Sequence, residues 1–541
     1  MSDLVLSGDE AVGRGALDAG LSGAFAYPGT PSTEIMEFMQ ENLEAYRASL
    51  PEADRAYTVA QWCCNEKTAY ESALGASFAG RRAMVSMKHV GLNVAMDPFT
   101  NSALVRIKGG LVVVVADDPG MHSSQDEQDS RVLADFARVP CFEPSDQQEA
   151  YDMTRAAFDY SEAHEVPVLL RITTRLAHSR SAVRTRAARV QNVQGKSDDP
   201  QSWILMPAMA RKRWKLLLEK NPQFRADAEE AASLALRNKG LGVITCGLGL
   251  RYYLENEEDW AAAHGGARPS HLHIGRYPMG FEKIRRLAAH VQKLLVIEEG
   301  YPFIEREING VFSAPLPVEG RLSGRIPLDG ELSADSVREA LGLAPRETLP
   351  APNLRIAQRP PQFCQGCPHA DSITALSEAL KGEAEFFAAS DIGCYTLSAL
   401  PPWNAVESCV DMGASIGMAR GASCVGQKKS VAVIGDSTFY HSGMTNIIDA
   451  LAHGNSLTVL ILDNSTTGMT GAQPTISPGS RLPALLEGLG VESKHIRLLE
   501  AHRKSHEVNV AAIREELCHE GVSVLILKRE CLEHLKKARR S

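Results

Sequence analysis

Short apolar runs alternate with longer amphipathic stretches along most of the chain. In the first third, apolar runs lie at residues 23–27, 83–87 and 111–115, and each is followed by a stretch with helical spacing. Near the end, runs at 431–434 and 457–462 repeat the pattern. Apolar runs of strand length that alternate with helical patterns are typical of an α/β fold with parallel sheets. We therefore predict a multidomain α/β protein built around parallel sheets.

Two polar segments interrupt this alternation and suggest the domain boundaries. Residues 191–235 are polar and then basic and amphipathic, which predicts a linker with surface helices. Residues 346–360 are rich in proline, which predicts a second, extended linker. The predicted domains are therefore a first α/β domain at 1–190, a smaller one at 236–345 and a last one at 361–541.

Composition and charge narrow the possible functions. The 541 residues are 44% hydrophobic and 23% charged, which predicts a globular chain with more than one core. A net charge of -9 argues against a nucleic-acid partner. The sequence has no uninterrupted apolar window of about 18 residues and no basic-then-apolar start, so we predict no membrane association and a cytoplasmic location.

Two turns near the end of the chain are candidates for a metal site. Gly435-Asp436-Ser437 follows one predicted strand, and Asn464 follows the next, so both lie at the carboxyl ends of neighbouring strands. Mg²⁺ prefers oxygen ligands and bridges to phosphates. Asp436, the amide oxygen of Asn464 and the backbone carbonyl of Thr466 could supply those ligands. Ordinary strand-end turns are the alternative interpretation.

Four of the eleven cysteines could form a second inorganic site. Cys364 and Cys367 form a C-x-x-C turn, Cys394 follows in DIGCYTL, and Cys531 follows the last predicted strand. Four thiolates can hold a [4Fe–4S] cluster. A structural zinc ion or four free thiols are the alternatives. We expect the other seven cysteines to be packed in buried positions.

The amino-acid sequence around these motifs is similar to that of a known enzyme family. GDSTFYHSGMTNIIDA, LDNSTTGMTGAQP, YPGTPSTEI and FCQGCPHA resemble segments of the large (alpha) subunit of indolepyruvate:ferredoxin oxidoreductases, and the resemblance covers almost the whole chain. These belong to the thiamine-diphosphate-dependent 2-oxoacid:ferredoxin oxidoreductase superfamily. The resemblance implies a pyrimidine-binding domain first, a transketolase-C-like domain next, and a diphosphate-binding domain last.

The resemblance also implies roles for particular residues. Glu66, in NEKTAYESALGA, matches the family glutamate that contacts the aminopyrimidine ring, although most glutamates face solvent. Thr30, in the YPGTPST turn, and the two histidines His89 and His122 are further catalytic candidates. A strand-to-helix connection and structural histidines are the plainer alternatives. The implied cofactor-binding residues are Glu66, Gly435, Asp436, Ser437, Thr438, Asn464, Thr466, Gly468, Met469 and Thr470.

By resemblance, the reaction is the oxidative decarboxylation of an aryl 2-oxoacid, of indolepyruvate or phenylpyruvate type, to acyl-CoA and CO₂. The implied cofactors are thiamine diphosphate, Mg²⁺ and one [4Fe–4S] cluster held by the four cysteines, with coenzyme A as co-substrate. The implied partners are a smaller beta subunit in a heterotetramer and ferredoxin or another electron carrier. The C-terminal ferredoxin-like domain of typical large subunits is missing from this sequence, so the acceptor is open. A non-oxidative decarboxylase or carboligase and a non-catalytic cofactor-binding subunit are the alternatives.

Overall fold

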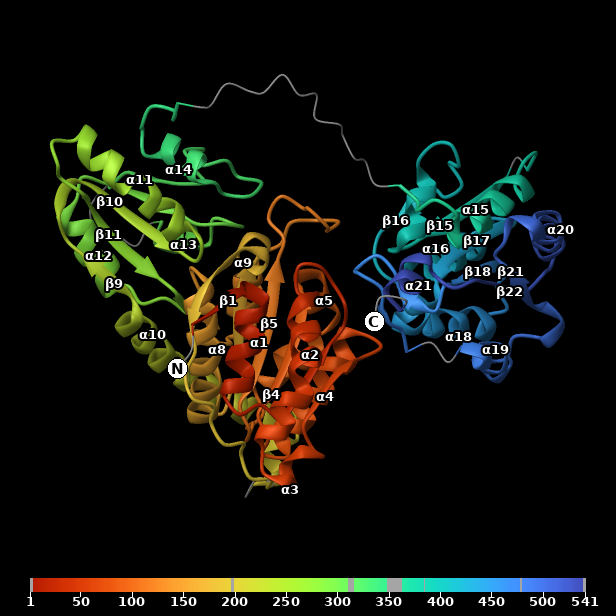
Figure 1. The fold of residues 1–541 in the computed structure, drawn as a ribbon, viewed down its shortest axis with the longest axis horizontal. Coiled ribbons are helices and arrows are strands. Elements are labelled where there is room, and N and C mark those ends of the chain that lie inside the picture. Colours follow the sequence, from red (N-terminus) through yellow and green to blue (C-terminus); the bar gives the residue numbers. More distant parts are fainter. Residues whose placement is uncertain are drawn as a thin grey trace. The chain divides into compact units, whose positions relative to one another are not determined.

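The computed structural model divides the chain into two compact units, residues 1–352 and 353–541 (Figure 1). The described residues are 3–195, 199–309, 316–347, 362–383, 385–476 and 479–538. Most of the linker predicted at 346–360 therefore lies outside the described residues. The division between the units falls within that predicted linker.

The first unit is built on a sheet that is parallel except at one edge. In spatial order its strands are β12 (Arg276–Tyr277), β6 (Cys141–Phe142), β7 (Val168–Thr173), β5 (Leu111–Asp117), β4 (Ala83–Lys88), β2 (Gly23–Ala26) and β3 (Val59–Trp62). Only β12 runs antiparallel to its neighbour. The central strands are largely apolar because helices cover both faces of the sheet.

Helices from the first third of the chain cover the two faces of this sheet. One face packs against α1 (Gly8–Asp18), α2 (Thr33–Ser49) and α8 (Gln147–His164), which lie together in Figure 1. The other face packs against α4 (Glu66–Phe78), α6 (Met96–Ser102) and α7 (Ser130–Ala137). Short helices α5 (His89–Val94) and α9 (Thr174–His178) follow β4 and β7, and β1 (Asp3–Ser7) pairs with β8 (Arg180–Arg184).

A second, five-stranded sheet completes the first unit. Its order is β14 (Val318–Glu319), β13 (Lys293–Ile297), β10 (Asn238–Cys246), β11 (Pro269–Ile274) and β9 (Ser233–Ala235). Its helices are α11 (Gly249–Ala263), α12 (Glu282–His290), α13 (Phe303–Ile308) and α14 (Ala334–Ala340). The long helix α10 (Pro207–Ala231) precedes it, and one hydrophobic core continues from the first sheet through α10 into the second.

Two fully buried arginines join these sheets. Arg171, on β7, donates to the carboxylate of Asp117 at 2.6 Å and to the carbonyl of Glu299, which follows β13, at 3.0 Å. Arg131 pairs with Asp129 and donates to the same Glu299 carbonyl at 3.1 Å. Because a buried charge without a partner is costly, the two sheets are held in one arrangement.

The second unit contains a fully parallel six-stranded sheet. Its order is β16 (Ser408–Cys409), β15 (Phe386–Ser390), β17 (Lys429–Gly435), β18 (Leu457–Asp463), β22 (Val522–Lys528) and β21 (Ile496–Glu500). One face packs against α15 (Pro368–Ala379) and α20 (His506–Glu516), and the other against α16 (Ala414–Cys424), α18 (Met444–Ala452) and α19 (Leu482–Leu489). The predicted α/β class with parallel sheets is therefore confirmed. No helix among the described residues is long and apolar enough to cross a bilayer.

Candidate functional site

The second unit places the two predicted metal-site turns side by side. Strands β17 and β18 are hydrogen-bonded neighbours, with Gly435 opposite Leu462, so both strands end at the same edge of the sheet. Asp436 begins the short helix α17 (Asp436–Thr438) directly after β17. The side chains of Asp436 and Asn464 are both buried.

Two buried carboxylates, those of Asp436 and Asp463, make this edge of the sheet a candidate cation site. Asp436 keeps one oxygen, Oδ2, without a hydrogen-bond partner among the described residues. Burial, followed by the nearby charge of Asp463, raises the pKa of Asp436 to about 8. Asp463 was not among the predicted ligands, although it precedes Asn464 in the chain. Asp463 already has a cation nearby, since its Oδ2 lies 3.4 Å from the Lys528 ammonium, so the unpartnered oxygen of Asp436 is the better candidate ligand. Mg²⁺ fits such an oxygen donor set.

Asp436→Asn is expected to stabilise the protein without cofactor while abolishing its response to cofactor. Folding raises the pKa of Asp436 to about 8, so the folded protein keeps this side chain protonated at pH values where the unfolded chain is ionised. The resulting loss of stability increases from about pH 4 to about pH 8, and asparagine removes it. Thermal unfolding at pH 7–8 should therefore show a higher Tm for the unloaded variant, by roughly 2–4 °C for each kcal/mol gained. Mg²⁺ with thiamine diphosphate should raise the Tm of the wild type but leave that of the variant unchanged. An equal rise in both proteins would exclude Asp436 as a ligand.

The remaining predicted cofactor-binding residues surround a small hairpin after β18. Asn464 accepts a hydrogen bond from the backbone N–H of Thr466 at 3.1 Å, and Thr466 lies in β19 (Thr466–Thr467), which pairs with β20 (Gln473–Pro474). Ser437 contacts the hydroxyl of Thr467 at 3.0 Å. Thr438 donates to the carbonyl of Ile392, and Thr470 to the side chain of Gln473. Met469 is about half exposed.

The buried ring of Tyr395 packs against the turn at Gly435, and the sequence analysis did not predict this contact. A Cβ atom at Gly435 would lie 2.9 Å from Cε1 of Tyr395, so only glycine leaves room for the ring. The Tyr395 hydroxyl donates to Asp391, which also accepts a hydrogen bond from Ser415 at 2.6 Å. Burial raises the pKa of Asp391 to about 7. The Asp391 side chain therefore anchors the ring that shapes the Gly435 turn.

The four predicted cysteines gather in the same unit. Cys367 donates its backbone N–H to the carbonyl of Cys364 at 3.0 Å, which closes the C-x-x-C turn before α15. Burial, reinforced by the other three thiols, raises the pKa of Cys394 to about 12. Because one thiol affects the pKa of another only at short range, these four cysteines lie close together. We call them the thiol cluster: Cys364, Cys367, Cys394 and Cys531.

Gly468 connects the thiol cluster with the candidate metal turn. A Cβ atom there would lie 3.4 Å from the Asn464 amide nitrogen, 3.7 Å from the Cys394 sulfur and 3.9 Å from the Cys531 sulfur. The backbone N–H of Cys531 also donates to the Asn464 carbonyl at 3.1 Å. One short loop is therefore in contact with both candidate sites.

The expectation that the other seven cysteines are buried is wrong for most of them. Only Cys141 and Cys246 are buried, whereas Cys63 and Cys64 are partly exposed. The exposed members are Cys409, Cys424 and Cys518. Cys424 ends helix α16, and Cys518 lies just after α20. The apolar residues near them in the sequence do not place these two side chains in the core.

The first unit buries the predicted pyrimidine-site glutamate. Glu66 is the first residue of α4, after the N-cap Asn65, and only 4% of its surface is exposed. A solvent-facing position is thereby excluded. A Cβ atom at Gly91, on α5, would lie 2.6 Å from Oε1 of Glu66, so the carboxylate rests directly against that glycine. Nothing in the local sequence indicates this role of Gly91.

Gly91→Ala is expected to displace the Glu66 carboxylate and lower turnover by tenfold or more. A methyl group 2.6 Å from a carboxylate oxygen forces one of the two groups to move. Gly75→Ala, on the helix that carries Glu66, is the matched control because a Cβ there meets nothing within 4 Å. It should preserve kcat and stabilise the protein by about 1 kcal/mol through helix propensity. Equal kcat values for the two variants would show that the position of Glu66 is unimportant.

The predicted Thr30 turn lies against a partly buried lysine. Ser123 donates its hydroxyl to the Thr30 carbonyl at 3.0 Å, and Lys88 donates to the Ser123 carbonyl at 2.9 Å. A Cβ atom at Gly29 would lie 3.1 Å from the Lys88 side chain. Burial lowers the pKa of Lys88, while the charges of Asp118 and Glu66 oppose that shift. Lys88 is thus a cation close to Thr30 and Glu66 that the sequence analysis missed.

The two candidate histidines occupy different environments. His89 is fully buried, and its Nε2 lies 3.2 Å from the Asp126 carbonyl. His122 is 53% exposed, and its Nε2 lies 3.6 Å from the Glu331 carboxylate. His89, next to Lys88, therefore remains a candidate for the site, whereas His122 lies on the surface.

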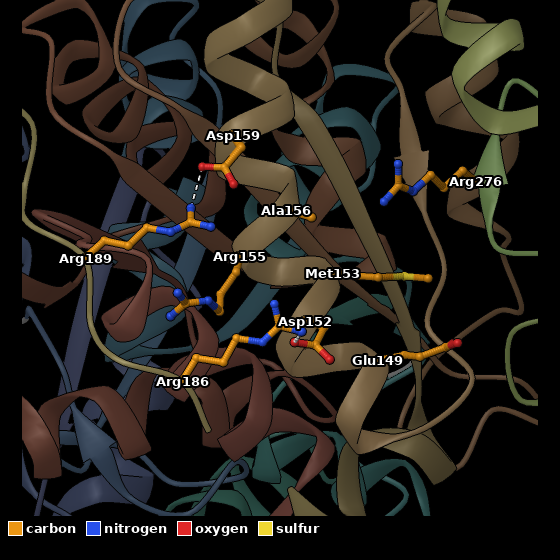
Figure 2. Close-up of a pocket in the computed structure, with 9 residues that line it drawn as sticks. All are labelled: Glu149, Asp152, Met153, Arg155, Ala156, Asp159, Arg186, Arg189 and Arg276. Atoms are coloured by element: carbon orange, nitrogen blue, oxygen red, sulfur yellow. Dashed lines mark hydrogen bonds and ion pairs between the residues drawn. The ribbon is translucent and has the colours of Figure 1, made fainter. Parts of the chain in front are cut away.

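A cavity elsewhere in the first unit contains none of the predicted site residues. It measures about 410 Å³ and lies along α8, with Arg155, Arg186, Arg189 and Arg276 among its lining residues (Figure 2). Arg189 pairs with Asp159 and Arg186 with Asp152. Because acidic partners neutralise these arginines, the cavity has little excess charge with which to hold an anion.

Comparison with known proteins identifies the class. Residues 14–230 match the family described as pyruvate flavodoxin/ferredoxin oxidoreductase, thiamine diP-bdg, and residues 391–539 match the thiamine pyrophosphate enzyme C-terminal TPP binding domain. A solved 2-oxoglutarate:ferredoxin oxidoreductase from Magnetococcus marinus, with 2-oxoglutarate, coenzyme A and succinyl-CoA bound, shares the fold. Its TM-score is 0.50 at 15% identity, over 63% of this chain and 65% of that chain. The chain is thus a thiamine-diphosphate-dependent 2-oxoacid oxidoreductase.

Curated relatives identify the family more narrowly. "Indolepyruvate oxidoreductase subunit IorA" of Archaeoglobus fulgidus is 36% identical over 99% of this chain and 87% of the relative. The protein of the same name from Methanothermobacter thermautotrophicus is 36% identical over 98% of this chain and 87% of the relative. The chain belongs to this IorA family, the large subunits of thiamine-diphosphate-dependent 2-oxoacid:ferredoxin oxidoreductases, and its chemistry is oxidative decarboxylation of a 2-oxoacid.

Proposed function

We propose that the protein decarboxylates an aryl 2-oxoacid of indolepyruvate or phenylpyruvate type. One 2-oxoacid, one coenzyme A and two oxidised one-electron carriers yield one acyl-CoA, one CO₂ and two reduced carriers. The aryl substrate is supported by the names of relatives that are 33–36% identical over nearly the whole chain. Ferredoxin or a similar carrier accepts the electrons through a [4Fe–4S] cluster.

We assign the diphosphate of the cofactor to residues of the second unit and its aminopyrimidine ring to a residue of the first unit. Asp436, Asn464 and the carbonyl of Thr466 would hold Mg²⁺ and, through it, the diphosphate. When bound, thiamine diphosphate supplies a nucleophilic carbon. It also accepts the electron pair of the bond between the carboxylate and the neighbouring carbon when that bond breaks. Glu66, buried against Gly91, would exchange a proton with the aminopyrimidine ring.

Residues near Glu66 are assigned to the substrate. Lys88 is a partly buried cation beside the Thr30 turn, so it can neutralise the carboxylate of a 2-oxoacid until CO₂ leaves. His89, buried beside Lys88, would hydrogen-bond the substrate. Exposed His122 is assigned no part in the chemistry.

The observation that carries the redox part is the contact of one loop with both candidate sites. A Cβ atom at Gly468 would lie within 4 Å of the Asn464 side chain and of two sulfurs of the thiol cluster, so this loop passes close to both. An oxidation that delivers electrons one at a time needs an acceptor close to the cofactor. A [4Fe–4S] cluster held by Cys364, Cys367, Cys394 and Cys531 would be such an acceptor.

The subunit composition is proposed from the family. A smaller beta subunit would complete a heterotetramer and contribute to the handling of coenzyme A or of the electron carrier. The name of the IorA relatives, a subunit of an oxidoreductase, supports a partner chain. No residue of this chain is assigned to coenzyme A.

An anaerobic assay of the chain with its partner subunit tests this proposal. Indolepyruvate, phenylpyruvate, pyruvate and 2-oxoglutarate would each be supplied with coenzyme A and either ferredoxin or a viologen dye. We expect acyl-CoA, CO₂ and reduced carrier in a ratio of one to one to two, with the aryl substrates preferred. Aldehyde formed without coenzyme A or acceptor would instead show a non-oxidative decarboxylase.

A further inference from the structure

Three ionisable side chains to which the proposed function assigns no role meet in the first unit. Asp9 lies in the first turn of α1, Glu34 in the first turn of α2, and His178 at the end of α9. One ligand atom from each lies within 4.8 Å of the other two. They are the one group of three such residues found this close together in the described part of the chain.

Tight packing of the three helices creates this group. A Cβ atom at Gly8 would lie 2.2 Å from the carbonyl oxygen of Leu176, so the start of α1 rests directly on the backbone of α9. That approach brings Asp9 to His178, two residues after Leu176. The Glu34 carboxylate closes the group, with its Oε2 3.8 Å from Nε2 of His178.

Asp9 is the unusual member because it is wholly buried and unsatisfied. Its exposed fraction is 0%, and neither carboxylate oxygen has a hydrogen-bond partner among the described residues. Burial and the neighbouring charge of Glu34 raise its pKa well above the usual value. A buried carboxylate with no partner is costly, and this one is aimed at two further ligand atoms. Such an arrangement is what a bound cation would satisfy.

We propose that Asp9, Glu34 and His178 bind a divalent transition-metal cation. Two carboxylates and one imidazole are a donor set that suits ions such as Mn²⁺, Fe²⁺ or Zn²⁺ better than Mg²⁺, which rarely takes nitrogen. The side chains of Glu34 and His178 are each a little under half exposed, so an ion can enter from solvent and keep water ligands. The ion would tie the start of α2, just beyond the Thr30 turn, to α1 and α9.

Counting bound Mn²⁺ tests the site independently of activity. The full chain with its partner subunit and thiamine diphosphate would be stripped with chelator and titrated with Mn²⁺, with free Mn²⁺ followed by electron paramagnetic resonance. We expect two ions per chain, one at this site and one replacing Mg²⁺ at Asp436. His178→Ala and Asp9→Asn should each lose one ion and keep the ion that depends on thiamine diphosphate. Asp436→Asn should lose only the latter.

The variants separate the possible outcomes. His178 is partly exposed, so its replacement by alanine keeps the test valid if Asp9→Asn fails to fold. Glu41→Gln, at an exposed position on α2, is the control and should bind as many ions as the wild type. Equal counts for wild type and His178→Ala would overturn the proposal and show that Asp9 is a protonated acid that donates to Glu34. An unchanged count in Asp436→Asn would contradict only the proposed magnesium site.

Discussion

Replacing Glu66 by glutamine is expected to lower kcat for decarboxylation by about 10²–10⁴-fold, the range for loss of a positioned proton-transfer group. The side chain is buried and its carboxylate rests against Gly91, so glutamine can take the same position without the ionisable group. The affinity for thiamine diphosphate should change little, because the diphosphate is assigned to the second unit. Release of CO₂ from carboxyl-labelled substrate and a thermal shift with cofactor would measure the two effects separately.

Glu71→Gln provides the comparison for this experiment. Glu71 lies on the same helix as Glu66, but its side chain is half exposed and pairs with Lys67 one turn earlier. Its replacement should leave kcat at the wild-type value. Unchanged turnover in Glu66→Gln, with normal cofactor binding, would remove Glu66 from the chemistry and favour a different acid.

Removal of one thiol from the thiol cluster should abolish electron transfer while sparing the first chemical step. In Cys394→Ala, iron bound per chain should fall from about four atoms towards zero, and reduction of ferredoxin or viologen should decrease more than a hundredfold. Cys394 is suited to this test because its sulfur lies close to Gly468 and to the other three thiols. A single turnover of CO₂ release should remain, since it precedes the transfer of electrons.

Exposed cysteines of the same unit supply the control for this prediction. Cys518→Ala removes a thiol that lies outside the thiol cluster, so its iron content and acceptor reduction should equal those of the wild type. Cys531→Ala should reproduce the Cys394→Ala result. Full acceptor reduction by either cluster variant, or protein that is free of iron yet active, would refute the [4Fe–4S] assignment.

The sequence was sufficient to predict the fold class because the strands are buried on both faces. Runs such as SVAVIG at β17 and LTVLILD at β18 are mostly apolar and are buried at every position, because helices cover both sides of these strands. What the pattern could not predict is how strands from distant segments combine. The pair Arg276–Tyr277 joins the edge of the first sheet through two residues, and so short a pairing leaves no periodic signal.

In the candidate site, too, features set by neighbouring residues in the sequence could be predicted, whereas contacts between residues far apart in the sequence could not. Asp436 and Asn464 could be proposed from sequence because each directly follows a strand, and neighbouring parallel strands end at one edge. The contact of Gly91 with Glu66, and of Tyr395 with Gly435, could not be predicted, because each joins residues that no spacing rule connects. The exposure of His122 could not be predicted either, because it depends on how its loop folds.

The hydrogen bond from Cys531 to the Asn464 carbonyl has a consequence for how the enzyme would fail in air. Dioxygen that destroyed the proposed iron centre would free the side chain of Cys531 and, with it, weaken one restraint on the backbone of Asn464, a proposed magnesium ligand. Loss of the electron acceptor would then be accompanied by weaker retention of the thiamine-derived coenzyme.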